Sequence, residues 1–248
     1  MLFQQLPPTR YDLRFSIAAI PVSVHPSFWL IALLFGASGD VLLLPIWVLV
    51  VFVSILIHEL GHAFAFRRYG QRSQILLYFG GGLTLPEPVY WGGGYASVGL
   101  TANQQIFISL AGPGAGFLFA ALIIFLVTVM GGSVLTTRLF GLIPLPLNAL
   151  LPFGGRILSV MISMLLWVNI FWGLINLVPV YPLDGGSITR NALIQVDPID
   201  GVRKSLWISV IAGGLVALAG LIFLRSIFMA LLFGLLAFQS FQSLQRRF

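Results

Sequence analysis

The sequence predicts an all-α polytopic membrane protein with about six transmembrane helices and a small membrane-associated β-hairpin or sheet between the second and third. Hydrophobic residues make up 58% of the 248 residues and charged residues only 8%, against about 25% charged in soluble domains. The apolar residues form blocks near the roughly 20 residues that one crossing requires. Cysteine is absent, which excludes disulfides and thiolate metal ligands.

Polar and Gly/Pro-rich segments divide the chain into candidate spans at residues 25–38, 43–68, 104–130, 157–178, 204–224 and 226–243. The first is the shortest and leads into a turn-like Gly36–Asp40 cluster, so we expect it to be tilted or only partly spanning. Residues 74–100 contain two short apolar runs around glycines and predict a β segment at the membrane edge. We expect residues 1–248 to form a single integral membrane domain without a soluble appendage.

The basic residues predict the orientation. With a cytoplasmic N-terminus and six spans, ten Lys and Arg residues fall inside and three fall outside, and the reverse orientation would invert this bias. Both termini are therefore expected in the cytoplasm. The net charge of +6 is spread between apolar blocks and not gathered into a run, so positive-inside loops explain it better than nucleic-acid binding. The inside residues are Arg10, Arg14, Arg67, Arg68, Arg72, Arg190, Arg203, Lys204, Arg246 and Arg247.

The motif His58-Glu59-Leu60-Gly61-His62 lies near the end of an apolar run that begins at Val41. H-E-x-x-H places two imidazoles on one face of a helix, where both can bind one metal ion. Zinc is the usual metal, with the glutamate beside its water. Ionisable groups in such a helix are costly and mark a functional site. The motif predicts a zinc hydrolase active site, about 8–14 Å below the cytoplasmic end of the helix.

A catalytic zinc normally takes three protein ligands and leaves one position open. Asp184 is the best candidate for the third ligand, because it directly follows the fourth span on the cytoplasmic side. Prolines before it end the helix, and Gly185 and Gly186 permit an unusual backbone that can hold a carboxylate at membrane depth. Depth alone leaves Glu87 open as an alternative. His25 is expected to pack at the interface. The other acidic residues lie near the N-terminus, on the outer side or in a polar inner loop, and are Asp12, Asp40, Asp197 and Asp200.

These residues together resemble the site-2 proteases, a family of intramembrane zinc metalloproteases. The resemblance rests on HELGH at 58–62 and N-x-x-P-x-x-P-L-D-G-G at 176–186. Support comes from Ala111-Gly112-Pro113, from Gly80-Gly81-Gly82 and from the Val24–Trp29 stretch. The sequence departs from the family at Gly114-Ala115-Gly116, where an asparagine is common, and it has no room for a PDZ or CBS domain.

The resemblance implies one zinc ion bound by His58, His62 and Asp184, with Glu59 as general base or acid. Asn176 would help to bind substrate or stabilise the oxyanion. The expected protein is an enzyme of a prokaryotic cell membrane, with its active site towards the cytoplasm. It would cleave within or near the transmembrane segment of a single-span membrane protein, in regulated intramembrane proteolysis. A substrate helix must unwind before cleavage, and an edge strand within residues 74–100 could pair with the unwound segment.

Other functions remain as alternatives. A metal or proton transporter could use the same cluster, although transporters tend to repeat such groups along a path in related halves. Gly36-Ala37-Ser38-Gly39 fits the G-x-S-G of rhomboid-type serine proteases, but Ser38 falls in a predicted outer turn and no histidine lies beyond residue 62. A catalytically inactive relative would lack Glu59 or a ligand, and none is missing. Peptide cleavage that is lost in Glu59→Gln would separate the protease from the transporter.

Overall fold

The computed structural model describes residues 9–36, 41–87, 89–91, 94–96, 99–139 and 143–247. The chain divides into two compact units, one containing Met1–Val98 with Ala111–Gly173 and the other Gly99–Leu110 with Leu174–Phe248. Within the described residues, five helices are long and apolar enough to cross a membrane. They are α2 (Leu44–Arg68, preceded by the 3₁₀ helix η1, Val41–Leu43), α3 (Ala102–Val129), α4 (Gly155–Asn176), α6 (Gly201–Ile222) and α7 (Ile227–Arg247).

These five helices agree with the last five spans expected from the sequence. The span expected at 25–38 contains α1 (Pro26–Gly36), which has 11 residues and is about 16 Å long. Such a helix is too short to cross a hydrocarbon core of about 30 Å by itself. The count of six spans is therefore approximate. Ser38, in the G-x-S-G pattern, lies outside the described residues.

The first unit contains a four-stranded sheet, in the order β1-β2-β3-β4. Its strands are β1 (Leu13–Ile17), β2 (Ile20–Val24), β3 (Ser73–Tyr78) and β4 (Gly81–Pro86). β2 and β3 are parallel, whereas β1–β2 and β3–β4 are antiparallel hairpins. A separate two-stranded ribbon joins β5 (Val89–Trp91) to β6 (Gly94–Ala96). The β segment expected within residues 74–100 is thus present, and β1 and β2 extend it beyond the prediction.

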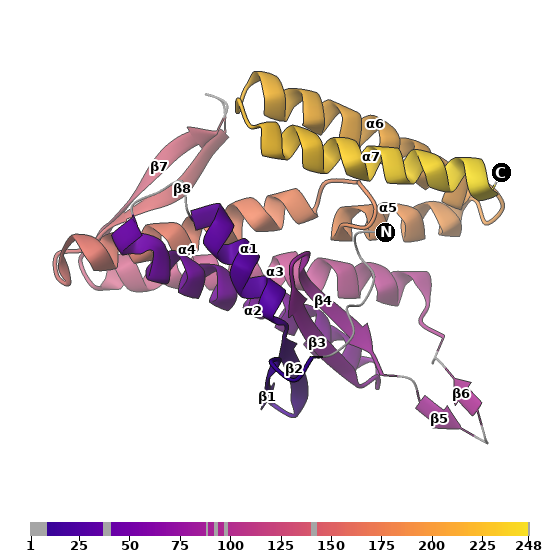
Figure 1. The fold of residues 1–248 in the computed structure, drawn as a ribbon, viewed down its shortest axis with the longest axis horizontal. Coiled ribbons are helices and arrows are strands. Elements are labelled where there is room, and N and C mark those ends of the chain that lie inside the picture. The colour runs from indigo at the N-terminus through magenta and orange to yellow at the C-terminus, as the bar shows by residue number, and fades with distance from the viewer. Residues whose placement is uncertain are drawn as a thin grey trace. The chain divides into compact units, whose positions relative to one another are not determined.

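The sheet packs against α2 (Figure 1). Alternate residues of β2 and β3 are buried, and Val24 and Leu77 pack in one cluster with Ile55 and Leu56 of α2. The same cluster contains Phe28, at the start of α1. The sheet therefore lies alongside the half of α2 that carries the HELGH motif.

The position of the sheet explains the length of α1. The rings of Phe28 and Trp29 lie 6.1 and 5.4 Å from the ring of Phe52. Farther along α1, Ala32 accepts a hydrogen bond from Trp47 Nε1 at 3.1 Å. α1 thus runs antiparallel to α2 from the level of Phe52 towards the start of α2. Because β2 has already brought the chain to the level of Phe52, a short helix is enough to reach from there towards the start of α2.

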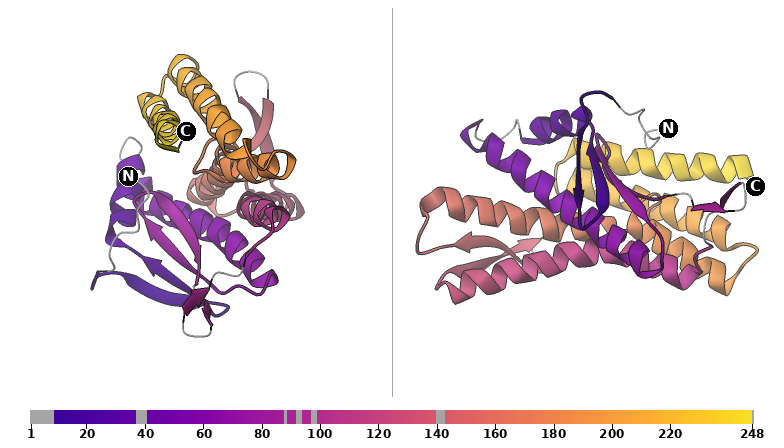
Figure 2. Two further views of the ribbon diagram at one scale, coloured as in Figure 1. Left: turned by 90° about the vertical axis from the view of Figure 1, so that its right-hand side faces the viewer. Right: turned by 90° about the horizontal axis from the view of Figure 1, so that it is seen from below.

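α3 and α4 run side by side in the first unit, with the hairpin of β7 (Ser133–Leu139) and β8 (Ile143–Leu150) at one end (Figure 2). Leu147 and Ala149 of β8 pack with Val127 of α3 and Leu166 of α4. The backbone N–H of Ala149 also donates to Ser163 Oγ in α4 at 2.9 Å. Between the spans expected at 104–130 and 157–178, the chain therefore forms a hairpin that packs on α3 and α4.

A buried polar contact joins two of the first unit's helices. Asn169 of α4 is 3% exposed, and its Nδ2 donates to Ser54 Oγ of α2 at 2.9 Å and to Leu165 O at 2.8 Å. Gly116 of α3 lies beside the same asparagine, because a Cβ there would stand 3.5 Å from its Oδ1. Ser54 is one helical turn before His58, so this contact fixes α4 against α2 next to the motif.

The second unit contains the hairpin of α6 and α7, which lie side by side in Figure 1. Small residues allow their close approach: a Cβ on Gly213 would lie 3.0 Å from the Cβ of Ala237. Arg225, with φ +49°, lies in the tight turn between them. The helix α5 (Asp184–Val196) lies between the spans expected at 157–178 and 204–224, where the sequence indicated only a polar inner loop. Tyr181 N, in the segment before α5, donates to Ser209 Oγ of α6 at 3.1 Å.

Candidate metal centre

The two histidines of HELGH face each other within α2. His58 Nε2 and His62 Nε2 lie 3.1 Å apart, and their ring planes make an angle of 77°. Both side chains are buried. One helical turn separates them, so the i, i+4 spacing produces the convergence that the motif predicts. Two buried imidazole nitrogens at this separation can bind the same metal ion.

Helix α3 approaches α2 closely at this pair. A Cβ on Gly112 would lie 2.2 Å from His62 Nε2 and 2.8 Å from His58 Nε2. A Cβ on Gly61 would lie 2.3 Å from the carbonyl oxygen of Ala111. No side chain larger than hydrogen fits at either glycine without displacement. The glycine of Ala111-Gly112-Pro113 therefore brings the α3 backbone against the imidazoles.

Glu59 lies beside the histidines and against the sheet. It is 5% exposed, and Thr84 Oγ1 of β4 lies 2.6 Å from its Oε2. A Cβ on Gly82 would come within 2.4 Å of the Glu59 side chain, so this glycine leaves the space that the carboxylate occupies. Burial raises the pKa of the Tyr78 hydroxyl above its ordinary value, and the charge of Glu59 raises it further. Tyr78 therefore remains protonated at neutral pH.

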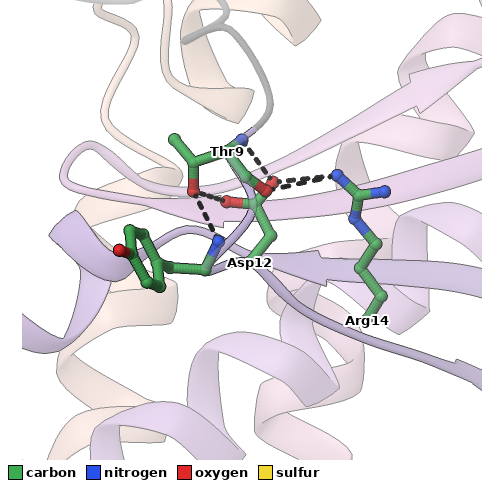
Figure 3. Close-up of polar contacts among 4 residues, drawn as sticks. Thr9, Asp12 and Arg14 are labelled. Carbon is green, nitrogen blue, oxygen red and sulfur yellow. Dashed lines mark hydrogen bonds and ion pairs between the residues drawn. The ribbon is translucent and has the colours of Figure 1, made fainter.

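The acidic residues set aside in the sequence have local structural roles. Asp12 accepts hydrogen bonds from Thr9 Oγ1 at 2.6 Å and Thr9 N at 3.1 Å, and Arg14 lies 3.5 Å away (Figure 3). The Thr9 hydroxyl makes the largest contribution to holding the pKa of Asp12 below its ordinary value. Asp197 ends α5 and accepts from the backbone N–H of Asp200, which lowers the pKa of Asp197, with a further contribution from Lys204.

His25 connects α1 to the sheet. Its Nδ1 accepts a hydrogen bond from the backbone N–H of Ser27 at 3.1 Å and lies 2.7 Å from Ser27 Oγ. That hydroxyl in turn accepts from the backbone N–H of Phe79 at 3.1 Å. These contacts account for the Nδ1 nitrogen and fit the packing role expected for His25.

The segment 176–186 lies in the second unit. α4 ends at Asn176, which is buried, and Asp184 is the first residue of α5. The expectation that Gly185 and Gly186 adopt an unusual backbone is wrong, because both lie in the helix without a positive φ. Their function is close packing: a Cβ on Gly185 would lie 2.2 Å from Leu177 O, and one on Gly186 would lie 2.4 Å from Tyr181 N. The glycines thus hold the preceding loop against the turn that carries Asp184.

Comparison with known proteins identifies the family. The model of peptidase family M50 matches residues 46–220, which is more than half of the chain and includes both HELGH and the 176–186 motif. The chain belongs to peptidase family M50. Family membership and the five apolar helices together indicate an integral membrane protein.

Three curated proteins similar to this chain carry related names. A zinc metalloprotease of Methanocaldococcus jannaschii is 26% identical over 86% of this chain and 54% of its own length. A putative zinc metalloprotease of Synechocystis is 28% identical over 73% of this chain and 44% of its own length. Putative zinc metalloprotease Rip3 of Mycobacterium tuberculosis is 31% identical over 67% of this chain and 32% of its own length. The chain spans about half or less of these curated relatives.

A solved structure shares the fold of this chain. The site-2 protease from Methanocaldococcus jannaschii superposes with a TM-score of 0.54 at 23% identity, covering 94% of this chain and 95% of that one. The expected architecture of apolar helices with a small sheet is therefore confirmed.

Sequence reasoning missed Thr84 and the buried pair of Ser54 and Asn169, and it gave Gly82 no role beyond its place in Gly80-Gly81-Gly82. Thr84 and Gly82 are two residues apart on a strand, so they share a face. The sequence could therefore show that Gly82 and Thr84 lie on the same face of a strand. Only the pairing of β4 with β3 and the packing of β3 on α2 show that this face meets Glu59.

Proposed function

We propose that this chain is an intramembrane zinc metalloprotease that hydrolyses a peptide bond within or near the transmembrane segment of a single-span membrane protein. The observation that carries the proposal is the pair of facing Nε2 atoms, 3.1 Å apart, with the buried Glu59 beside them on an apolar helix. The M50 family and the zinc metalloprotease names of its relatives support the same activity.

The histidine pair fits zinc. Two Zn–N bonds of about 2.0–2.1 Å in tetrahedral geometry place the nitrogens about 3.3–3.4 Å apart, close to the separation observed here. We propose Asp184 as the third ligand, because it offers the carboxylate oxygen that a His₂-carboxylate set requires. Its position in the first turn of α5 favours a negative charge. One zinc ion would then retain one open coordination position.

The proposed reaction uses Glu59 as the base. Zinc, when bound, would lower the pKa of a water molecule and polarise the substrate carbonyl. Glu59 would accept the proton of that water as its oxygen bonds to the carbonyl carbon, and would pass the proton to the amine nitrogen as the C–N bond breaks. The amide of Asn176 would donate a hydrogen bond to the developing oxyanion. Burial of Glu59 at 5% exposure keeps bulk water from competing for the proton.

We propose that the substrate is presented as an extended strand. A transmembrane helix encloses its peptide bonds in its own hydrogen bonds, so it must unwind before attack. Among the described strands, β4 is an edge of the four-stranded sheet and carries Gly82 and Thr84 next to Glu59. Pairing of an unwound substrate with β4 would bring its backbone beside the catalytic base.

The proposed orientation places the N- and C-termini and the metal site towards the cytoplasm. Arg67 Nη1, at the end of α2, donates to Ala18 O in the β1–β2 turn at 2.9 Å. The N-terminal hairpin, which carries Arg14, is therefore on the same side as the Arg67–Arg68 pair. Grouping of these basic residues supports the orientation derived from the positive-inside rule.

The test is co-expression of wild type and Glu59→Gln with tagged single-span substrates. We expect wild type to release a truncated product and Glu59→Gln to release none, with equal amounts of both proteins in the membrane. Zinc or proton movement into sealed vesicles, without cleavage of any substrate, would instead support the transporter alternative. A role in regulated intramembrane proteolysis predicts in addition that cleavage depends on a prior change in the substrate.

A further inference from the structure

We propose that Thr84 is a positioning residue for Glu59, acting through a hydrogen bond from its hydroxyl to the carboxylate. The catalytic consequence rests on the proposed protease function, whereas the hydrogen bond itself can be tested without any activity.

The contact is short and partly buried. Thr84 Oγ1 lies 2.6 Å from Glu59 Oε2 and 3.1 Å from the main-chain oxygen of Glu59. A hydroxyl has only one hydrogen to donate. Of the two oxygens, the carboxylate Oε2 is the closer and the stronger acceptor, so we assign the hydrogen bond to it. The donated hydrogen bond engages Oε2 and leaves Oε1 as the oxygen free to accept a proton. A Cβ on Gly82 would lie 2.4 Å from Oε1, so the glycine leaves room for this oxygen.

The sheet, and not α2, supplies this restraint. Thr84 pairs with Ile75 and Gly82 with Leu77 across the β3–β4 ladder, so all four residues share one face. Ile75 and Leu77 are fully buried in the cluster that contains Ile55 and Leu56 of α2. Thr84 is therefore fixed by a packed face and aims its hydroxyl at α2. A glutamate side chain otherwise has three free torsions, and the fixed donor selects one of its rotamers.

Two consequences follow for the reaction. Without the hydroxyl, the carboxylate would occupy several positions, and its proton-accepting oxygen would be misplaced for part of the time. Misplacement by about 1 Å can cost about 100-fold in rate, so we expect a decrease in kcat of about 10- to 100-fold. Because Thr84 lies on the edge strand β4, movement of that strand would also move the donor of Glu59. Base positioning and strand position are thus mechanically linked.

The kinetic experiment compares Thr84→Val with Thr84→Ser in the full-length protein. Valine keeps the shape and removes the hydroxyl, whereas serine keeps the hydroxyl and removes the methyl group. We expect Thr84→Val to lower kcat with little change in KM, and Thr84→Ser to restore most of it. Thr128→Val is the matched control, because it removes an exposed hydroxyl that bonds only to Ile124 O within α3. Equal kcat in Thr84→Val and wild type would overturn the proposal.

A second readout does not require cleavage. The chain contains only two glutamates, Glu59 and Glu87, so labelling the glutamate δ-carbon with ¹³C gives two carboxyl resonances. Glu59→Gln assigns them, and Glu87 serves as the internal reference. We expect Thr84→Val to shift the Glu59 resonance in the metal-free protein, Thr84→Ser to restore it, and Glu87 to remain unchanged. An unshifted Glu59 resonance would overturn the contact.

The two readouts separate the possible failures. If wild type shows no Glu59-dependent cleavage, the proposed function and the catalytic role of Thr84 both fail, while the carboxyl resonance still decides the contact. If the resonance shifts but kcat is retained, the contact exists and the positioning role is refuted.

Discussion

Gly112→Ala tests the packing of α3 against the histidine pair. The added methyl group would lie 2.2 Å from His62 Nε2 and 2.8 Å from His58 Nε2, whereas non-bonded heavy atoms pack at about 3.5–4.0 Å. The imidazoles or the α3 backbone must therefore move by more than about 1 Å. A metal site tolerates only about 0.2 Å of change in its ligand distances. We expect Gly112→Ala to lose most of its zinc and at least about 100-fold in cleavage rate.

The assay measures zinc per polypeptide in purified protein, together with cleavage of a single-span substrate. Gly114→Ala is the matched control, because a Cβ there meets nothing within 4 Å in the same helix. Both substitutions replace a helical glycine with alanine, and this replacement by itself stabilises the helix by about 0.5–1 kcal/mol. Loss of zinc only in Gly112→Ala would therefore come from the contact. Wild-type zinc content and activity in Gly112→Ala would refute the reasoning.

Three further predictions concern the surroundings of the site. A double-mutant cycle of Ser54→Ala and Asn169→Ala should show a coupling of about 0.6 kcal/mol in unfolding free energy, typical of interhelical hydrogen bonds in membranes; a coupling of zero would show that the contact adds nothing. Gly185→Ala should lower the thermal midpoint and the zinc content, because its Cβ would overlap Leu177 O, whereas Gly214→Ala, which meets nothing within 4 Å, should not. His25→Phe should retain zinc but lose stability, and loss of zinc with unchanged stability would make His25 a ligand.

The helices and the first two metal ligands were predictable because their signals are local. Apolar blocks define α2, α3, α4, α6 and α7, and a spacing of four residues places His58 beside His62 whatever the rest of the fold. The hairpin of β1 and β2 was missed, although the I-P-V-S-V of β2 alternates as a strand does. Its two-residue turn, Ala18-Ala19, has φ values of +48° and +63°, and the usual Asn-Gly signal for such a turn is absent.

Non-local contacts account for the other differences. Val22 pairs with Ile75 in parallel across 53 positions of sequence, and no local pattern specifies that register. α1 is short because β2 has already brought the chain to the level of Phe52 before α1 begins. A hydropathy pattern does not show the position of the preceding strand. The sequence D-G-G has the composition of a turn, yet it starts α5 because its glycines pack against Leu177 and Tyr181. Thr84 is the only polar side chain in the sequence of β4, and only the packing of the sheet shows that this side chain meets Glu59.

The central claim is that a zinc ion on this chain and Glu59 together cleave a membrane-embedded peptide. The most direct measurement determines zinc content and cleavage rate in the same purified preparations of wild type, Glu59→Gln and Asp184→Asn. We predict one zinc per chain with cleavage in wild type, retained zinc without cleavage in Glu59→Gln, and loss of both in Asp184→Asn. Cleavage by Glu59→Gln at the wild-type rate, or wild-type zinc and activity in Asp184→Asn, would contradict this account.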